Sequence, residues 1–202
     1  MSGISNYLAG KQAALEFNGT AFSEPTTIYI ALLTCTNGPL ARSTAYALNN
    51  TVSFVAADGQ NHLYNCTTAG TTAASAPAYP GYANEVITDG TAVFTEQTSA
   101  LQAGTAMVEP SGNGYARVSE AMTSGNWTVS NHTITNAAAI NFPTPTGPWQ
   151  TSPAEFWGFA TYDAATVGNL LRFGGLTSDQ IINTGNTVSF AIGAVTFKTD
   201  AG

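Results

Sequence analysis

The side chains of this chain that could do metal or thiol chemistry are few and far apart. His62 and His132 lie seventy residues apart, each beside a turn sequence and among Asn and Thr rather than acids. Cys35 and Cys66 each fall inside an apparent strand, outside any Cys-x-x-Cys or Cys/His pattern. We therefore predict surface or turn histidines and two buried free thiols, with a disulfide as the alternative for the thiols. No metal site and no cofactor are expected.

Carboxylates are the remaining reactive groups. A glycosidase needs two that meet across the fold, and the pool that could supply them is Asp58, Glu85, Asp89, Glu96, Glu109, Glu120, Glu155 and Asp163. Nothing singles out a pair. The sequence also lacks the Gly-x-Ser-x-Gly, His-Glu-x-x-His, phosphate-loop and EF-hand patterns. We name no catalytic residue and predict a protein that is not an enzyme.

Two further groups of residues admit a binding role and a structural one. Asp163, Thr166 and Asn169 could offer oxygens to calcium, but an Asp that opens a turn closed by Gly168 is the preferred interpretation. The large aromatic residues are more typical of core or interface anchors than of a sugar-binding platform. These aromatic residues are Trp127, Trp149, Trp157, Tyr79, Tyr82 and Phe156.

The charge pattern limits the possible partners. Only 8% of the 202 residues are charged, the net charge is −7, and the five basic residues are scattered. Nucleic acid and anionic lipid call for clustered Lys or Arg, so neither is an expected partner. Met1 is followed by a polar stretch, and no apolar run approaches a membrane span, so no export signal or membrane insertion is expected. A surface so weakly charged suits a subunit packed in an assembly.

The elements that must position these residues are mostly short strands. Residues 2–17 predict a helix, capped by Ser2 or Ser5 and ended by Asn18-Gly19, which packs on its own sheet or on a neighbouring subunit. Asp89-Gly90 and Ser130-Asn131 predict hairpin turns, and residues 70–82 and 95–114 predict loops. Strands are expected at 27–35, 51–56, 63–68, 85–94, 115–118, 127–129, 132–135, 137–142, 155–162, 169–173, 187–192 and 195–197. Residues 1–202 are thus predicted to form a single all-β domain, an antiparallel β-sandwich of jelly-roll type with a short N-terminal α-helix.

An ordered series of motifs carries a family resemblance. It comprises Ile4-Ser-Asn-Tyr-Leu-Ala-Gly-Lys11, Asn18-Gly-Thr-Ala, Ile28-Tyr-Ile-Ala-Leu-Leu-Thr34, Gly112-Asn-Gly-Tyr-Ala-Arg-Val118, Ala138-Ala-Ile-Asn-Phe-Pro143, Trp157-Gly158, Tyr162-Asp-Ala164, Gly168-Asn-Leu-Leu171 and Asn186-Thr-Val-Ser-Phe190. In these residues the chain resembles small virion proteins of tailed bacteriophages that are labelled tail or tail-fibre proteins. The resemblance covers residues 4–34 and 112–198, and it implies that residues 42–111 are an insertion within the sandwich.

The resemblance implies a structural role in a virion assembled in the host bacterial cytoplasm. On this interpretation the chain is a tail or neck accessory subunit, or a capsid-decorating one. It would act through contacts with other virion proteins and with its own copies as a homo-oligomer. Two alternatives stay open: a module that binds host-surface glycans through exposed Trp and Tyr, and a hydrolase of cell-surface polysaccharide.

Overall fold

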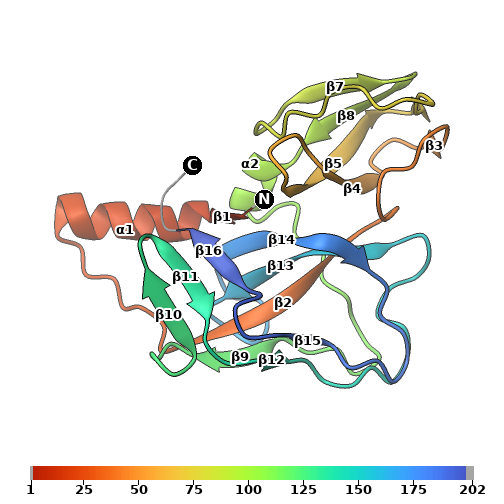
Figure 1. Cartoon of the computed structure of the whole chain (residues 1–202). Coiled ribbons are helices and arrows are strands. Elements are labelled where there is room, and N and C mark those ends of the chain that lie inside the picture. Colours follow the sequence, from red (N-terminus) through yellow and green to blue (C-terminus); the bar gives the residue numbers. More distant parts are fainter. Residues whose placement is uncertain (1, 199–202) are drawn as a thin grey trace.

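A five-stranded antiparallel sheet organises the molecule (Figure 1). In the computed structural model, which describes residues 2–198, the strand order is β1-β14-β13-β2-β9. The strands are β1 (Ser2–Ile4), β14 (Leu170–Gln180), β13 (Glu155–Tyr162), β2 (Thr27–Cys35) and β9 (Val118–Ala121). β2 and β13 have the bounds expected from sequence and are buried along most of their length. This burial explains why both read as apolar on two sides.

One face of this sheet is covered by small sheets from the C-terminal half. These are the three-stranded β10 (Trp127–Ser130), β11 (Thr133–Asn136) and β16 (Thr196–Lys198), and the pair β12 (Ile140–Asn141) and β15 (Ser189–Phe190). A core that includes Phe156, Phe159, Trp149 and Phe197 fills the space between the layers.

The other face carries a separate group of strands, which we call the upper lobe (residues 45–102; upper right in Figure 1). It holds β3 (Ala45–Tyr46), β4 (Thr51–Val55), β5 (Asn61–Thr68), β6 (Gly70–Thr71), β7 (Val86–Asp89), β8 (Ala92–Glu96) and the five-residue helix α2 (Thr98–Gln102). Its sheets are β4-β5-β8-β7 and β3-β6. The lobe has its own apolar core, and a further core joins it to the central sheet through Leu63, Leu101 and Trp157. The lobe lies within residues 42–111, but whether that segment is an insertion stays a prediction.

Two hairpin turns are shifted by one residue from their predicted positions. Asp89 pairs with Ala92, so Gly90 and Thr91 form the β7–β8 loop. Ser130 pairs with Thr133, so the β10–β11 loop is Asn131-His132, with φ of 45° and 63°. Two-residue hairpin loops favour residues that accept positive φ, which Gly90, Asn131 and His132 provide. Asp89 and Ser130, which precede these two loops, are therefore strand residues.

The predicted start of the helix at residue 2 was wrong. Residues 2–4 instead add β1 to the edge of β14, and α1 (Asn6–Asn18) follows. Ser5 is the N-cap: its hydroxyl accepts the Leu8 N–H and donates to the Leu170 carbonyl at 2.5 Å. Gly19, in the left-handed region, ends the helix as expected.

Other differences are local. The strand expected at 115–118 lies at Val118–Ala121, α2 occupies part of an expected loop, and β14 extends to Gln180. The all-β sandwich with one short N-terminal helix is confirmed, whereas its jelly-roll character stays a prediction.

Candidate functional site

His62 lies in the interior of the upper lobe, so the prediction of a surface or turn histidine was wrong for this residue. Its Nδ1 lies 3.0 Å from Glu96 Oε1 and its Nε2 lies 2.9 Å from Asp58 Oδ2. β5 supplies the histidine, β8 the glutamate, and the β4–β5 turn the aspartate. His132, in contrast, is exposed in the β10–β11 turn, as predicted.

The Glu96 carboxylate is fully saturated by hydrogen bonds. Besides the His62 contact, Oε1 accepts the Thr98 hydroxyl at 2.5 Å, and Oε2 accepts the backbone N–H groups of Asn84 and Thr98 at 3.0 and 2.8 Å. Burial alone would raise the pKa of Glu96, but the bonds from His62 and Thr98 lower it below 4.5. Such a carboxylate cross-links strands and has no free lone pair with which to attack or deprotonate a substrate.

A second buried carboxylate, Asp89, is also held by several hydrogen bonds from within the protein. It accepts bonds from Arg42 Nη1 at 2.6 Å, the Tyr79 hydroxyl at 2.7 Å and the Ala73 N–H at 2.9 Å. These contacts tie the irregular segment 72–82 to the β7–β8 hairpin. Burial and the neighbouring carboxylate raise the pKa of Tyr79, so its hydroxyl stays protonated.

The Gly-Tyr-Ala-Arg motif at residues 114–117, which is part of the family resemblance, has a structural role: its side chains hold neighbouring segments together. Arg117 holds Glu109 with two bonds of 2.6 and 3.0 Å and stacks 3.5 Å from the Tyr162 ring centroid. Its remaining nitrogen donates to the carbonyls of Ala164 and Val167 at 2.9 and 2.8 Å. The Tyr115 hydroxyl donates to Glu109 and accepts the Leu32 N–H of the central sheet. These contacts engage Tyr115 and Arg117 outside the ladder, and of the strand predicted at 115–118 only Val118 lies in β9.

The Asp163 segment forms the predicted turn. Asp163 Oδ1 accepts the Asn169 N–H at 2.6 Å, Oδ2 accepts the Asn169 side chain at 2.7 Å, and Gly168 has φ of +72°. The carboxylate oxygens are thus used within the turn. Among residues 2–198 no group of three or more His, Cys, Asp or Glu could hold a metal ion.

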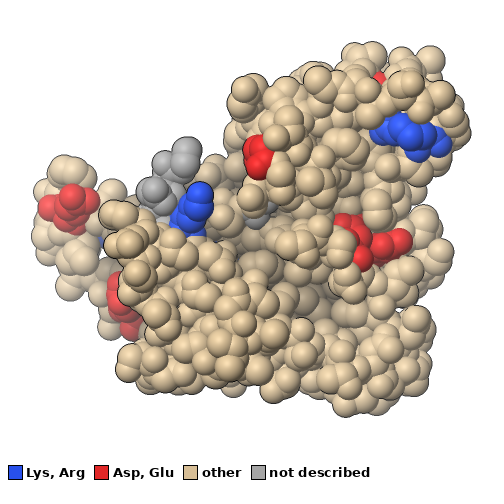
Figure 2. Space-filling view, viewed as in Figure 1, with Lys and Arg blue, Asp and Glu red and all other residues tan. Residues whose placement is uncertain are grey.

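Asp179, absent from the carboxylate pool above, joins the central sheet to the upper lobe. It lies near the end of β14 and accepts the Ser53 hydroxyl of β4, the Asn61 amide of β5 at 2.9 Å and the Cys35 thiol of β2 at 3.8 Å. Its partners stand 118 to 144 residues away in sequence, so no local motif marks it. Figure 2 shows acidic side chains in the recess between the lobe and the body.

Both cysteines are buried free thiols, as predicted. They belong to different apolar clusters, Cys35 to the core beneath the lobe and Cys66 to the core inside it. Burial and the charge of Asp179 raise the pKa of Cys35 to about 12. Because the thiolate is the reactive form, this cysteine is held unreactive.

Acidity should stabilise the junction at Asp179. Burial raises the pKa of Asp179 above 3.8, and burial together with Asp179 raises the pKa of Glu155 above 4.5. When the pKa of a carboxyl is higher in the folded chain than in the unfolded one, the free energy of unfolding falls as the pH rises from the unfolded pKa to the folded one. We therefore expect the unfolding free energy of the wild type, relative to Asp179→Asn, to fall as the pH rises above about 4, where the carboxyls of the unfolded chain ionise. Urea unfolding of both chains across this range measures the difference; a difference that grows with pH would contradict the assignment.

The aromatic residues are core anchors, with one exception. Trp127, Trp149, Trp157, Tyr79 and Phe156 are buried, as the structural interpretation predicted. Tyr82 is 73% exposed on the loop before β7. A stacking platform of several aromatic residues is therefore not formed by this set.

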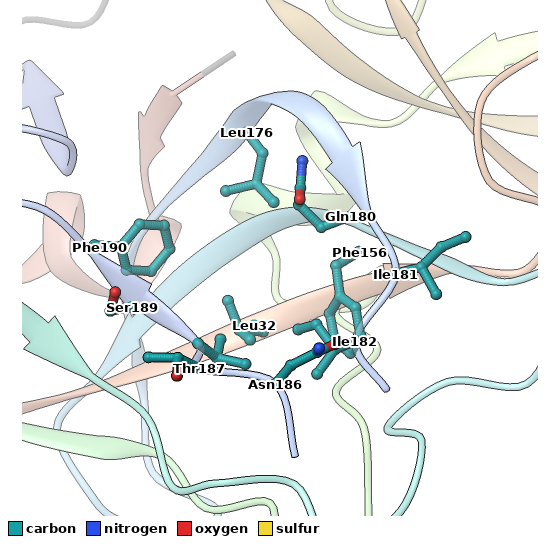
Figure 3. A pocket seen from close by; sticks show the side chains of 11 residues that line it. Leu32, Phe156, Leu176, Gln180, Ile181, Ile182, Asn186, Thr187, Ser189 and Phe190 are labelled. Carbon is teal, nitrogen blue, oxygen red and sulfur yellow. The ribbon is translucent and has the colours of Figure 1, made fainter. Parts of the chain in front are cut away.

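Two open cavities differ in the polarity of their walls. One, of about 340 Å³, lies between the end of β14 and the segment that leads into β15, with Phe156 and Leu32 at its base (Figure 3). Ile182 and Phe190 flank it, and its polar side chains are Gln180, Asn186, Thr187 and Ser189. A second, of about 400 Å³, lies beside the β10–β11 hairpin. Neither gathers the acids and bases of a catalytic centre.

The exposed surface contains the most distinctive feature. Helix α1 projects from the body, with its C-terminal end farthest away (Figure 1). Leu8 is its one buried residue, while Leu15 and Phe17 are 51% and 80% exposed. The expectation that the helix packs on its own sheet thus holds for the first turns alone. No helix within residues 2–198 is long and apolar enough to cross a membrane.

Comparison with known proteins identifies the family. The family model described as Podophage GP4 fiber I protein gp80 matches residues 59–198, more than half of the chain. The match begins inside segment 42–111, so it does not mark that segment as an insertion. No curated protein matches the chain. The match confirms the resemblance to tail-fibre-type proteins: this chain belongs to the family of podophage fiber I protein gp80 and is a structural component of a phage virion.

Proposed function

We propose that this chain is a non-enzymatic subunit of the phage tail apparatus, attached to its neighbours by the projecting part of α1. The observation that carries the proposal is the exposure of Leu15 and Phe17 on a helix that leaves the body after its first turns. The word fiber in the family description favours the tail over a neck or capsid-decorating position. On this proposal the subunit joins the particle in the host cytoplasm, before lysis.

The physics of short helices supports an attachment role for α1. Isolated helices of 13 residues are marginal in water, and most helical stability in proteins comes from packing of an apolar face. Here Ser5 and Gly19 cap the two ends, but the last two turns have almost no tertiary packing. A partner that covered them would bury apolar area and stabilise the helix at the same time.

The charge distribution supports contact surfaces rather than a reactive site. Figure 2 shows Lys, Arg, Asp and Glu only as small separate patches on a surface that is otherwise uncharged. Arg42 and Arg117 are held in ion pairs inside the chain. The buried acids serve as internal cross-links, which leaves a surface of Thr, Ser, Asn and Ala with little charge to keep neighbours apart.

The glycan-binding alternative retains little support. Its aromatic residues are buried apart from Tyr82, and Tyr79 lies in the lobe core with its hydroxyl on Asp89. The hydrolase alternative requires a free carboxylate pair. The buried acids Asp89 and Glu96 are saturated by protein donors, and Asp179, the acidic neighbour of Glu155, accepts bonds from Ser53, Asn61 and Cys35.

Incorporation into particles tests the proposal. We expect Phe17→Ser combined with Leu15→Ser to reduce the amount of this protein in purified virions at least about tenfold. Burial of one large apolar side chain in an interface contributes about 1.5–3 kcal/mol to the binding free energy, and about 1.4 kcal/mol corresponds to a factor of ten in affinity. Phage lacking the wild-type gene would be grown on cells that supply the variant, and the virions quantified by mass spectrometry. Val86→Ser with Leu48→Ser, on the upper lobe, is the matched control. Wild-type incorporation of the α1 variant, with its thermal unfolding unchanged, would refute the attachment role.

A further inference from the structure

The cavity beside the β10–β11 hairpin combines apolar walls with one cation. Ile28, Trp127, Leu171 and Phe197 line its interior, and Met122 and Val129 stand at its partly exposed rim. Its volume of about 400 Å³ falls in the range of sites that accept a ligand or an anchoring side chain. Arg172 is its charged lining residue.

Arg172 lacks a carboxylate neighbour within ion-pair distance in the part of the chain that the structure describes. One of its nitrogens donates to the Lys198 carbonyl at 3.1 Å. Burial lowers the pKa of the guanidinium, which Glu24 offsets from a distance. A partly desolvated cation in an apolar wall favours an occupant that brings a carboxylate together with an apolar group.

The projecting end of α1 has that chemistry. Gly10, Ala13, Ala14 and Phe17 share one side of the helix at i, i+3, i+4 and i+7 spacing, opposite the side of Leu8. The small residues let another surface approach closely, and Phe17 stands out from them as an anchor. Glu16, also exposed, borders this stripe.

We propose that the occupant is a second copy of this chain: Phe17 of one copy enters the cavity of the other, and Glu16 pairs with Arg172. The inference rests on the proposed function, since it names the partner of α1. The apolar anchor matches the apolar walls, and the carboxylate matches a guanidinium that has no ion-pair partner among residues 2–198. Helix α1 and the β10–β11 hairpin lie at the same end of the molecule (Figure 1). Two copies can therefore exchange helices reciprocally, or several can form a closed ring, and in either assembly the Phe17 side chain of one copy occupies the cavity of another.

Charge reversal tests this contact in the full-length chain. By sedimentation velocity, we expect the wild type to self-associate, and Glu16→Arg or Arg172→Glu to weaken association at least about tenfold. An equimolar mixture of the two variants should associate again, because each helix then meets a cavity of opposite charge. Restoration in the mixture also shows that Arg172→Glu is folded. Gln12→Arg, at an exposed position on the Leu8 side of α1, is the control and should associate as the wild type does.

Three results would overturn the inference. The first is a wild type that stays monomeric at every soluble concentration. The second is an Arg172→Glu variant that associates as strongly as the wild type. The third is a mixture of the two variants that associates no more strongly than either variant alone. If α1 variants still fail to enter virions in any of these cases, the attachment role stands and the partner of α1 is a different virion protein. If α1 variants enter virions normally, the proposed function itself fails.

Discussion

Trp157→Ala is expected to lower the free energy of unfolding by about 3–5 kcal/mol. Trp157 is fully buried in β13 and packs in the core that joins the central sheet to the upper lobe, where Leu63 of β5 and Leu101 of α2 also lie. Its indole N–H has no hydrogen-bond partner among the described residues, so the substitution removes no side-chain hydrogen bond there. The cost therefore comes from lost apolar contact and from the cavity that remains.

Urea unfolding followed by circular dichroism measures this change. Hydrogen exchange adds a spatial test: protection should fall in β5 and α2, across the junction, as well as in β13. Val86→Ala, at a position 66% exposed, is the control and should change stability by less than about 0.5 kcal/mol. A loss below about 1 kcal/mol for Trp157→Ala would mean that the lobe and the sheet do not depend on this shared core.

The strands that the sequence predicted best are those whose burial is uniform. β2 and β13 are apolar on both sides because each lies between two other strands with a core on each face. Their bounds follow from composition alone. The edges were harder: residues 2–4 form a strand only because β14 offers an open edge, and nothing local distinguishes them from the first turn of a helix.

The predicted positions of two turns were off by one residue, for a physical reason. An Asp-Gly or Ser-Asn pair marks a turn but does not fix which two residues form its loop, since that depends on the register of the flanking strands. In the β7–β8 hairpin, Asp89 is drawn into the ladder because Arg42 and Tyr79 bind its side chain from outside the hairpin.

The buried charges could not be predicted because their partners come from distant strands. His62 looked like a surface residue beside Gly59-Gln-Asn61, yet the β4–β5 pairing carries it inside, between acids on two different elements. In a chain with only 8% charged residues, several of the acids are used to hold strands together rather than to keep the surface soluble. That use of charge links the composition to the adhesive role proposed above.

Glu96→Ala is expected to destabilise the upper lobe by about 3–5 kcal/mol, because it leaves His62 and the N–H groups of Asn84 and Thr98 without their acceptor. The effect should depend on pH in the direction opposite to that of Asp179. The pKa of Glu96 is lowered by its hydrogen bonds, so the stability it contributes is present above its unfolded value of 4.5 and is lost as pH falls through the folded value.

Hydrogen exchange in β5 and β8, with urea unfolding at neutral and acidic pH, measures both parts of this prediction. Asp58→Asn is the matched control, because it removes the other carboxylate on His62 from a side chain that is 40% exposed. Its cost should be no more than about 1 kcal/mol, as for exposed ion pairs. If Glu96→Ala cost no more than Asp58→Asn, or if its effect grew on acidification, the buried carboxylate would not be the charged cross-link between β5 and β8 that its contacts indicate.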